Sequence, residues 1–125
     1  MRAGFALLAF GALAACDSPA IGDARAQALL ALPAPQHYAE RQVARELVGQ
    51  CPAYAYDEQL GDALTDRRIR ARQQVYAQVK GATDLEADVK RRSLAARYGS
   101  NDACRILDGE TAAGTPLSVM VRKRG

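Results

Sequence analysis

The sequence predicts a small all-α domain, a bundle of about four helices. Apolar residues recur at helical spacing through most of the chain, whereas the strict alternation of a half-buried strand persists nowhere. The 125 residues, of which 49% are hydrophobic and 25% charged, suit a single small globular domain. This length excludes a multidomain enzyme, and the net charge of +3 is far below that of a dedicated nucleic-acid binder.

The first fifteen residues, MRAGFALLAFGALAA, predict a secretory signal segment. Its apolar run is shorter than the roughly 20 residues that a membrane-spanning helix needs. The run ends in Leu13-Ala14-Ala15-Cys16, which resembles the lipobox of bacterial lipoproteins. The resemblance implies cleavage after residue 15 and a diacylglycerol group on Cys16 as the membrane anchor. An ordinary cleavable signal followed by a chance cysteine is the alternative.

Residues 16–35 are predicted to form a lipidated tether, because Pro19, Pro33 and Pro35 stand there among small residues. A short helix over 23–32 is the alternative. Two or three acyl chains on one cysteine suffice for stable anchoring. We therefore expect a protein of the bacterial cell envelope whose helical domain, residues 36–125, faces the periplasm, with the choice of inner or outer membrane left open.

The helical domain is predicted to begin with a helix from residue 36. Ala39, Val43 and Leu47 form an apolar stripe, and Cys51 falls one further turn along it. We therefore expect this cysteine at the end of the helix, facing the core. A second helical stretch, as one helix or two, is predicted over 57–80.

The third predicted helix has a start signal and a stop signal. The sequence TDLE over 83–86 has the pattern of a capping box, in which the Thr and Glu side chains each satisfy a backbone N–H. Gly99 suits the left-handed conformation that ends a helix. Between these signals, Leu85, Val89 and Ala96 are predicted to form the buried stripe.

Cysteine usage predicts one disulfide. If Cys16 carries lipid, Cys51 and Cys104 remain as an even pair in an oxidising compartment. A bridge between them would close a long loop, for which the loop-entropy model gives about 4 kcal/mol of stabilisation. Two free, buried thiols are the alternative.

A fourth helix, capped by Ser100 or Asn101, and a short final turn from Thr115-Pro116 complete the prediction. The order of segments resembles an uncharacterised family of small secreted helical proteins from alphaproteobacteria. The segments are ELVGQC, DRRIRARQQVYAQV, DLEADVKRRSLAARYG, DACRILDGE and GTPLSVMVRKR. The resemblance, over about residues 36–124, implies the helical fold and the pairing of the two cysteines, and it implies no activity.

Few residues suggest catalysis. His37 is the single histidine, and we expect it partly exposed at a helix start, since catalysis or metal binding would require partners. Glu58, Asp62 and Asp66 are spaced by four residues and could hold a divalent ion. A surface of weak ion pairs, such as Asp66 with Arg70, explains them better. No catalytic residue, metal or cofactor is predicted.

Two basic segments are candidates for contact with an anionic surface. They are Arg67, Arg68, Arg70 and Arg72 in the second helical stretch, and Arg122, Lys123 and Arg124 in the tail. Export would place nucleic acid in another compartment, so anionic lipid headgroups are the expected partner, at about 1 kcal/mol per basic residue near the surface. A solvated helix face without any partner is the alternative that an arginine-rich composition favours.

Taken as a whole, the sequence favours a non-enzymatic envelope lipoprotein whose helical domain binds another envelope component. The alternative is an acid- or stress-activated periplasmic chaperone, in which protonation of the 14 carboxylates would expose apolar surface. A small hydrolase ranks third, because no pocketed pair of carboxylates can be identified. The oligomeric state is left open.

Overall fold

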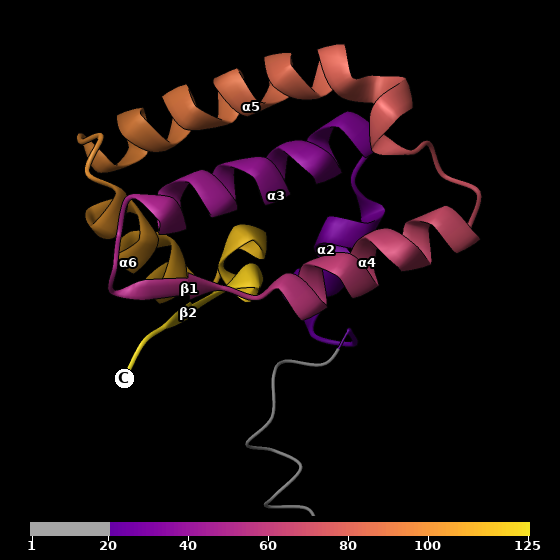
Figure 1. Ribbon diagram of the computed structural model, residues 1–125. Coiled ribbons are helices and arrows are strands. Elements are labelled where there is room, and N and C mark those ends of the chain that lie inside the picture. Colours follow the sequence, from indigo (N-terminus) through magenta and orange to yellow (C-terminus); the bar gives the residue numbers. More distant parts are fainter. Residues whose placement is uncertain (1–20) are drawn as a thin grey trace, which may run out of the picture.

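The all-α class predicted from the sequence is confirmed by a computed structural model, which describes residues 21–125 (Figure 1). In chain order the elements are α2 (Ala24–Ala31), α3 (Ala34–Gly49), β1 (Tyr54–Tyr56), α4 (Glu58–Arg70), α5 (Tyr76–Tyr98), α6 (Ala103–Ala113), the 3-10 helix η1 (Pro116–Met120) and β2 (Val121–Lys123). Helix α3 is central: α5 packs along one side of it, and η1, α6 and the strands lie on the other. The signal segment and the predicted lipidation site, Cys16, lie outside the described residues.

The predicted core stripe of α3 and the predicted disulfide are both confirmed. Ala39, Val43 and Leu47 belong to the main buried cluster, and Cys51 is fully buried beyond the helix end. Cys51 and Cys104 form a disulfide with their Cα atoms 5.1 Å apart, within the usual range for a bridge. The bond ties the C-terminal end of α3 to the first turn of α6.

Within residues 21–35 the structure shows helix α2, which matches the alternative of a short helix over 23–32, in place of the predicted tether. Ala26 and Leu29 are fully buried in the main core, and α2 packs against η1, so the segment belongs to the domain. Asp23 caps the helix by accepting a hydrogen bond from the backbone N–H of Arg25 at 2.8 Å. Pro33 and Pro35 mark the boundary between α2 and α3, because Pro33 is the N-cap residue of α3 and Pro35 lies in its first turn.

The predicted second and third helices are α4 and α5, with different bounds. The stretch over 57–80 is interrupted after Arg70, where Arg72 adopts a positive φ of 62°. Helix α5 begins at Tyr76, so the predicted capping box at 83–86 lies inside a helix and is wrong as a start signal. Its predicted end is confirmed, since Gly99 adopts the left-handed conformation with φ 60°.

The predicted buried stripe of α5 is also wrong. Leu85 is 72% exposed and Val89 54% exposed, and Ala96 faces solvent as well. The face turned to the protein carries Thr83 and Ala87, which are fully buried, together with Val79 and Leu94. The small side chains of Thr83 and Ala87 let α5 approach α3 closely. The helix therefore buries this face, and Leu85 and Val89 stay on the outer face.

The C-terminal region adds two features that the pattern of the sequence misses or misplaces. Asp102, rather than Ser100 or Asn101, caps α6, and its carboxylate accepts a hydrogen bond from the backbone N–H of Cys104 at 3.0 Å. Strands β1 and β2 pair antiparallel, with Tyr56 opposite Val121. Strands of three residues are too short to show alternation, which explains why the sequence did not predict them.

Candidate ligand-binding cleft

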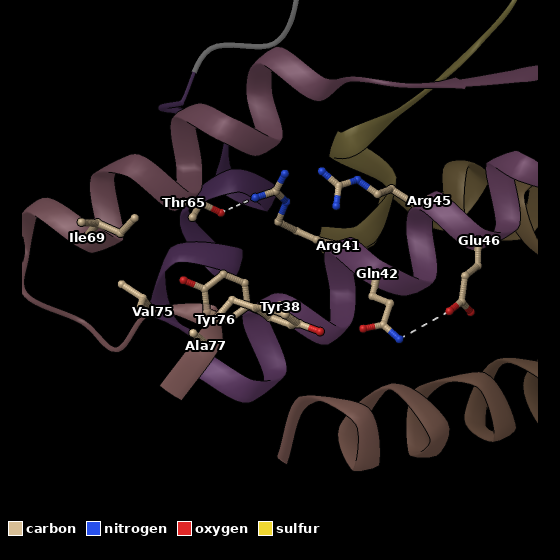
Figure 2. A pocket seen from close by; sticks show the side chains of 10 residues that line it. All are labelled: Tyr38, Arg41, Gln42, Arg45, Glu46, Thr65, Ile69, Val75, Tyr76 and Ala77. Carbon is tan, nitrogen blue, oxygen red and sulfur yellow. Dashed lines mark hydrogen bonds between the residues drawn. The ribbon is translucent and has the colours of Figure 1, made fainter. Parts of the chain in front are cut away.

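A cleft of about 680 Å³ opens between α3, α4 and the start of α5 (Figure 2). Its volume lies within the range of about 300–1,000 Å³ that is typical of small-molecule sites. The lining residues are Tyr38, Arg41, Gln42, Arg45, Glu46, Thr65, Ile69, Val75, Tyr76 and Ala77. The two ends differ: Figure 2 shows the apolar side chains at the side of the α4–α5 connection, and the arginines, the glutamine and the glutamate toward the middle of α3.

Aromatic packing shapes the apolar end. The rings of Tyr38 and Tyr76 meet edge to face, with their centroids 5.5 Å apart. The Tyr38 hydroxyl donates a hydrogen bond to the backbone carbonyl of Gln74 at 3.3 Å, which holds the α4–α5 connection against α3. Ile69 and Tyr76 remain 46% and 40% exposed, so this end presents apolar surface to the cleft.

Arg41 is the best-held side chain of the polar end. Its guanidinium donates to the Tyr56 hydroxyl at 3.1 Å, to the Thr65 hydroxyl and to the Asp62 carboxylate at 3.2 Å. Gly61 makes room for these contacts, because a Cβ at this position would lie 2.6 Å from the Tyr56 hydroxyl oxygen. A glycine within α4 is unfavourable for helix formation, and here it admits the side chains that hold Arg41.

His37 lies behind Arg41, and its predicted partial exposure is wrong: the side chain is fully buried. Nδ1 lies 3.0 Å from the backbone carbonyl oxygen of Leu29, which can only accept, so Nδ1 carries the proton. Nε2, 3.2 Å from the Thr65 hydroxyl oxygen, therefore accepts a hydrogen bond from that hydroxyl. Burial lowers the pKa of His37 to about 4, which keeps the ring neutral near pH 7.

A hydroxyl bonded to a neutral histidine is also the arrangement of a nucleophile and its general base. In this protein the Thr65 oxygen additionally accepts an N–H from Arg41, which engages one of its two lone pairs. The hydrogen bonds run from Arg41 through Thr65 to His37 and on to the carbonyl of Leu29. This chain fixes the position of the Arg41 guanidinium beside the cleft.

Arg45 is less constrained than Arg41. It donates to both carboxylate oxygens of Glu58, at 2.8 and 3.3 Å, and its guanidinium carbon lies 5.1 Å from the centroid of the Tyr56 ring. Glu46, which also lines the cleft, is engaged from outside by Arg91 at 2.7 and 2.8 Å. These hydrogen bonds lower the pKa of the Glu46 carboxyl, so it stays ionised and paired.

The structure separates the basic residues that the sequence grouped. Arg68 is buried and donates from one nitrogen to the carbonyls of Leu30 and Leu32, at 2.7 Å each, so its predicted role in surface contact is wrong. It caps the C-terminal end of α2, where the helix dipole favours a cation. Burial lowers the pKa of its guanidinium.

The other predicted basic residues lie at opposite ends of the molecule. Those of α4 and the following connection (Arg67, Arg70 and Arg72) are exposed, and Arg70 forms the predicted ion pair with Asp66 at 3.0 Å. Those of the tail lie near the C-terminus, beyond the far end of α3 (Figure 1). They are also exposed, and Arg124 donates to the backbone carbonyl of Tyr54 at 3.0 Å. The two groups do not form one patch.

The cleft itself was missed by the sequence analysis. One signal was present: Tyr38, Arg41 and Arg45 are spaced by three and four residues, which places them on one face of α3 beside the apolar stripe. That Tyr38 and Arg41 are buried could not be read from the spacing, since their partners come from α4 and α5.

Within residues 21–125, no cluster of three or more His, Cys, Asp or Glu side chains is placed to hold a metal ion, and none of the helices has the length and apolar character of a membrane span. Comparison with protein-family models, with curated proteins and with solved structures finds no match. Function is therefore inferred from the residues themselves.

Proposed function

We propose that this protein is a non-enzymatic, lipid-anchored protein of the bacterial cell envelope whose cleft binds another envelope component. The cleft carries the binding part of the proposal, because it combines an open apolar end with an arginine held by three hydrogen-bonding partners. Small-molecule sites typically pair apolar lining with a few fixed polar groups. The lipobox-like Leu13-Ala14-Ala15-Cys16 supports the anchor, and a disulfide is typical of proteins in oxidising compartments.

The anchor is tested by growing cells with an alkyne-bearing fatty acid and detecting acyl label on the protein. We expect label on the wild type and on Ser18→Ala, and none on Cys16→Ala. We also expect the wild type in the membrane fraction and the Cys16→Ala variant outside it. Label that survives in Cys16→Ala would contradict lipidation at this residue.

The binding role is tested by purifying the lipidated protein from envelope fractions and identifying the molecules that co-purify with it by mass spectrometry. Tyr76→Asp places a charge in the apolar end of the cleft, and Leu85→Asp places one on the exposed face of α5 as a matched control. We expect bound material to be lost only from the cleft variant. Equal recovery from both variants would show that the cleft is not the site.

A chaperone is the second candidate function, and the exposed apolar pair Leu85 and Val89 on α5 favours it. Acid would protonate carboxylates that now form ion pairs, and the resulting positive charge would loosen the packing. Such a chaperone should bind an apolar dye and protect unfolded clients at about pH 2 to 3. No increase over neutral pH would exclude this function.

A further inference from the structure

The apolar end of the cleft offers surface that a ligand can bury. Ile69, Val75, Tyr76 and Ala77 face it from α4, the connection and α5, with Tyr38 beside them from α3 (Figure 2). Ile69 and Tyr76 are two of the four large hydrophobic residues exposed within residues 21–125. Covering such surface stabilises a complex by roughly 25 cal/mol per Å². A ligand with an apolar chain is therefore favoured at this end.

The polar end of the cleft offers two arginine side chains, and the carboxylates that pair with them lie outside the lining. Arg41 and Arg45 line the cleft, whereas their carboxylate partners, Asp62 and Glu58, do not. The Asp62 and Glu58 side chains are 74% and 59% exposed. The pair of Arg45 with Glu58 is exposed on both sides, and such pairs contribute little to stability. Glu58 occupies two of the five N–H donors of Arg45, which leaves donors for a second anion.

The remaining charge of the lining does not cancel the preference of the two arginines for an anion. Glu46 is bonded through both oxygens to Arg91, so its negative charge is already balanced at the edge of the cleft. Arg41 keeps its orientation through Thr65 and Tyr56, even if Asp62 turns away into solvent. The polar end therefore favours an anion over a cation. A carboxylate suits it, because carboxylates and guanidinium groups form strong, charge-assisted hydrogen bonds.

We infer that the cleft binds a single-chain fatty acid, with its carboxylate at Arg41 and Arg45 and its chain over Ile69, Val75 and Tyr76. This inference rests on the proposed function, since it names the chemical class of the envelope component. The observation that supports it is the arrangement of the lining residues along the cleft. The cationic side chains lie toward the middle of α3, and the apolar side chains lie toward the α4–α5 connection.

The test is photo-crosslinking of the purified full-length protein in solution, which does not require that the protein be anchored to a membrane. The probe is hexadecanoic acid with a diazirine at the far end of its chain, and the matched probe is the corresponding hexadecanol. Because the reactive group sits at the chain end, mass spectrometry should place crosslinks in residues 69–77. We expect the acid to label this segment about tenfold more than the alcohol, since charge-assisted hydrogen bonds hold only the acid.

Two pairs of variants separate the two ends of the site. Arg45→Gln should reduce labelling by the acid about tenfold and leave labelling by the alcohol unchanged. Its control is Arg92→Gln, which removes an exposed arginine paired with Asp88 on α5. Ile69→Glu should reduce labelling by both probes, and its control is Val89→Glu, at a similarly exposed apolar position.

Each outcome decides the inference. Equal labelling of residues 69–77 by acid and alcohol would overturn it, while a cleft that binds another envelope component would remain. Crosslinks spread over Leu85 and Val89 to the same extent would overturn it too, by showing that any exposed apolar surface reacts. If the wild type carries no acyl label in the metabolic labelling experiment, only the lipid anchor is refuted. The crosslinking comparison of acid with alcohol does not depend on Cys16.

Discussion

The two ends of α3 are stabilised by different kinds of interaction. At the C-terminal end, Cys51 is bonded to Cys104 of α6, and Leu47 lies in the apolar core. At the N-terminal end, His37 and Arg41 share the Thr65 hydroxyl, and nearby Arg68 caps α2. The first end is tied by a covalent bond, and the second by hydrogen bonds that reach the surface of a cleft. The difference shows that the hydrogen-bonded end of α3 is the one that holds polar groups in fixed positions beside the cleft.

The N-terminal end of α3 is sensitive to substitution, because its hydrogen-bonding groups depend on one another. A buried polar network is stable only while each donor and acceptor has its partner, and the loss of one partner leaves the others unsatisfied. The disulfide end has no such dependence, because the bridge acts largely by restricting the unfolded chain. Substitutions at the two ends should therefore differ in size and in pH dependence.

The largest effect is expected from breaking the disulfide. Cys51→Ser or Cys104→Ser should each lower the melting temperature by more than about 10 °C, because the bridge contributes about 4 kcal/mol. The double variant should be no less stable than either single variant, since one bond is lost in every case. Thermal unfolding with and without reductant measures this, and a reduced protein that melts at the same temperature as the oxidised one would contradict it.

Arg68→Met should lower the free energy of unfolding by about 3 kcal/mol, because the carbonyls of Leu30 and Leu32 lose their donor inside the protein. The matched control is Arg67→Met, an exposed neighbour on the same helix, for which we expect a change below about 0.5 kcal/mol. Urea unfolding at pH 7 compares them. Equal losses from the two variants would mean that the cap contributes nothing.

His37 should make the cleft end sensitive to acid. Its pKa is lowered from 6.5 to about 4 by burial, so between these values the unfolded state binds a proton that the folded state does not. Stability from this residue is present above pH 6.5 and falls as the pH drops toward 4. Between pH 7 and 4.5 the wild type should lose roughly 2 to 3 kcal/mol more than His37→Gln in urea unfolding. Parallel pH profiles of the two proteins would refute this role of the histidine.

The smallest effect is expected on the outer face of α5, away from both ends. Leu85→Ser should change the free energy of unfolding by less than about 0.5 kcal/mol, because the side chain is already exposed. On the inner face of the same helix, Leu94→Ala should cost about 3 kcal/mol, since it leaves a cavity in the core. Chemical denaturation of both variants distinguishes them. A large loss from the outer variant would mean that this face is covered in solution.

Sequence patterns predicted the disulfide end better than the cleft end. The stripe that leads to Cys51 is a local feature, and the even pair of cysteines is a matter of counting, so both could be found without a structure. The environments of His37 and Arg68 could not be predicted, because His37 bonds to Thr65, 28 positions away, and Arg68 to Leu30 and Leu32, 38 and 36 positions away. The windows of about 11 to 18 residues in which periodicity is read do not contain both members of these pairs.

Helix α5 shows a second reason for error. Its sequence carries two stripes of apolar or small residues, and the larger side chains of Leu85 and Val89 made the wrong stripe the stronger signal. Packing was decided by the close approach to α3, which small residues such as Ala87 permit. Periodicity identified the helix and Gly99 its end, but the stripe of larger side chains did not mark its buried face.

The packing of α2 against η1 also determines when the domain can fold. Arg25 donates to the Ser118 hydroxyl at 3.1 Å, across a separation of 93 positions. During synthesis Ala26 and Leu29 leave the ribosome well before their partners in η1 do. Such distant contacts form late and slowly. The nascent chain therefore stays without a complete core until η1 has emerged, and until then it is narrower than the folded domain.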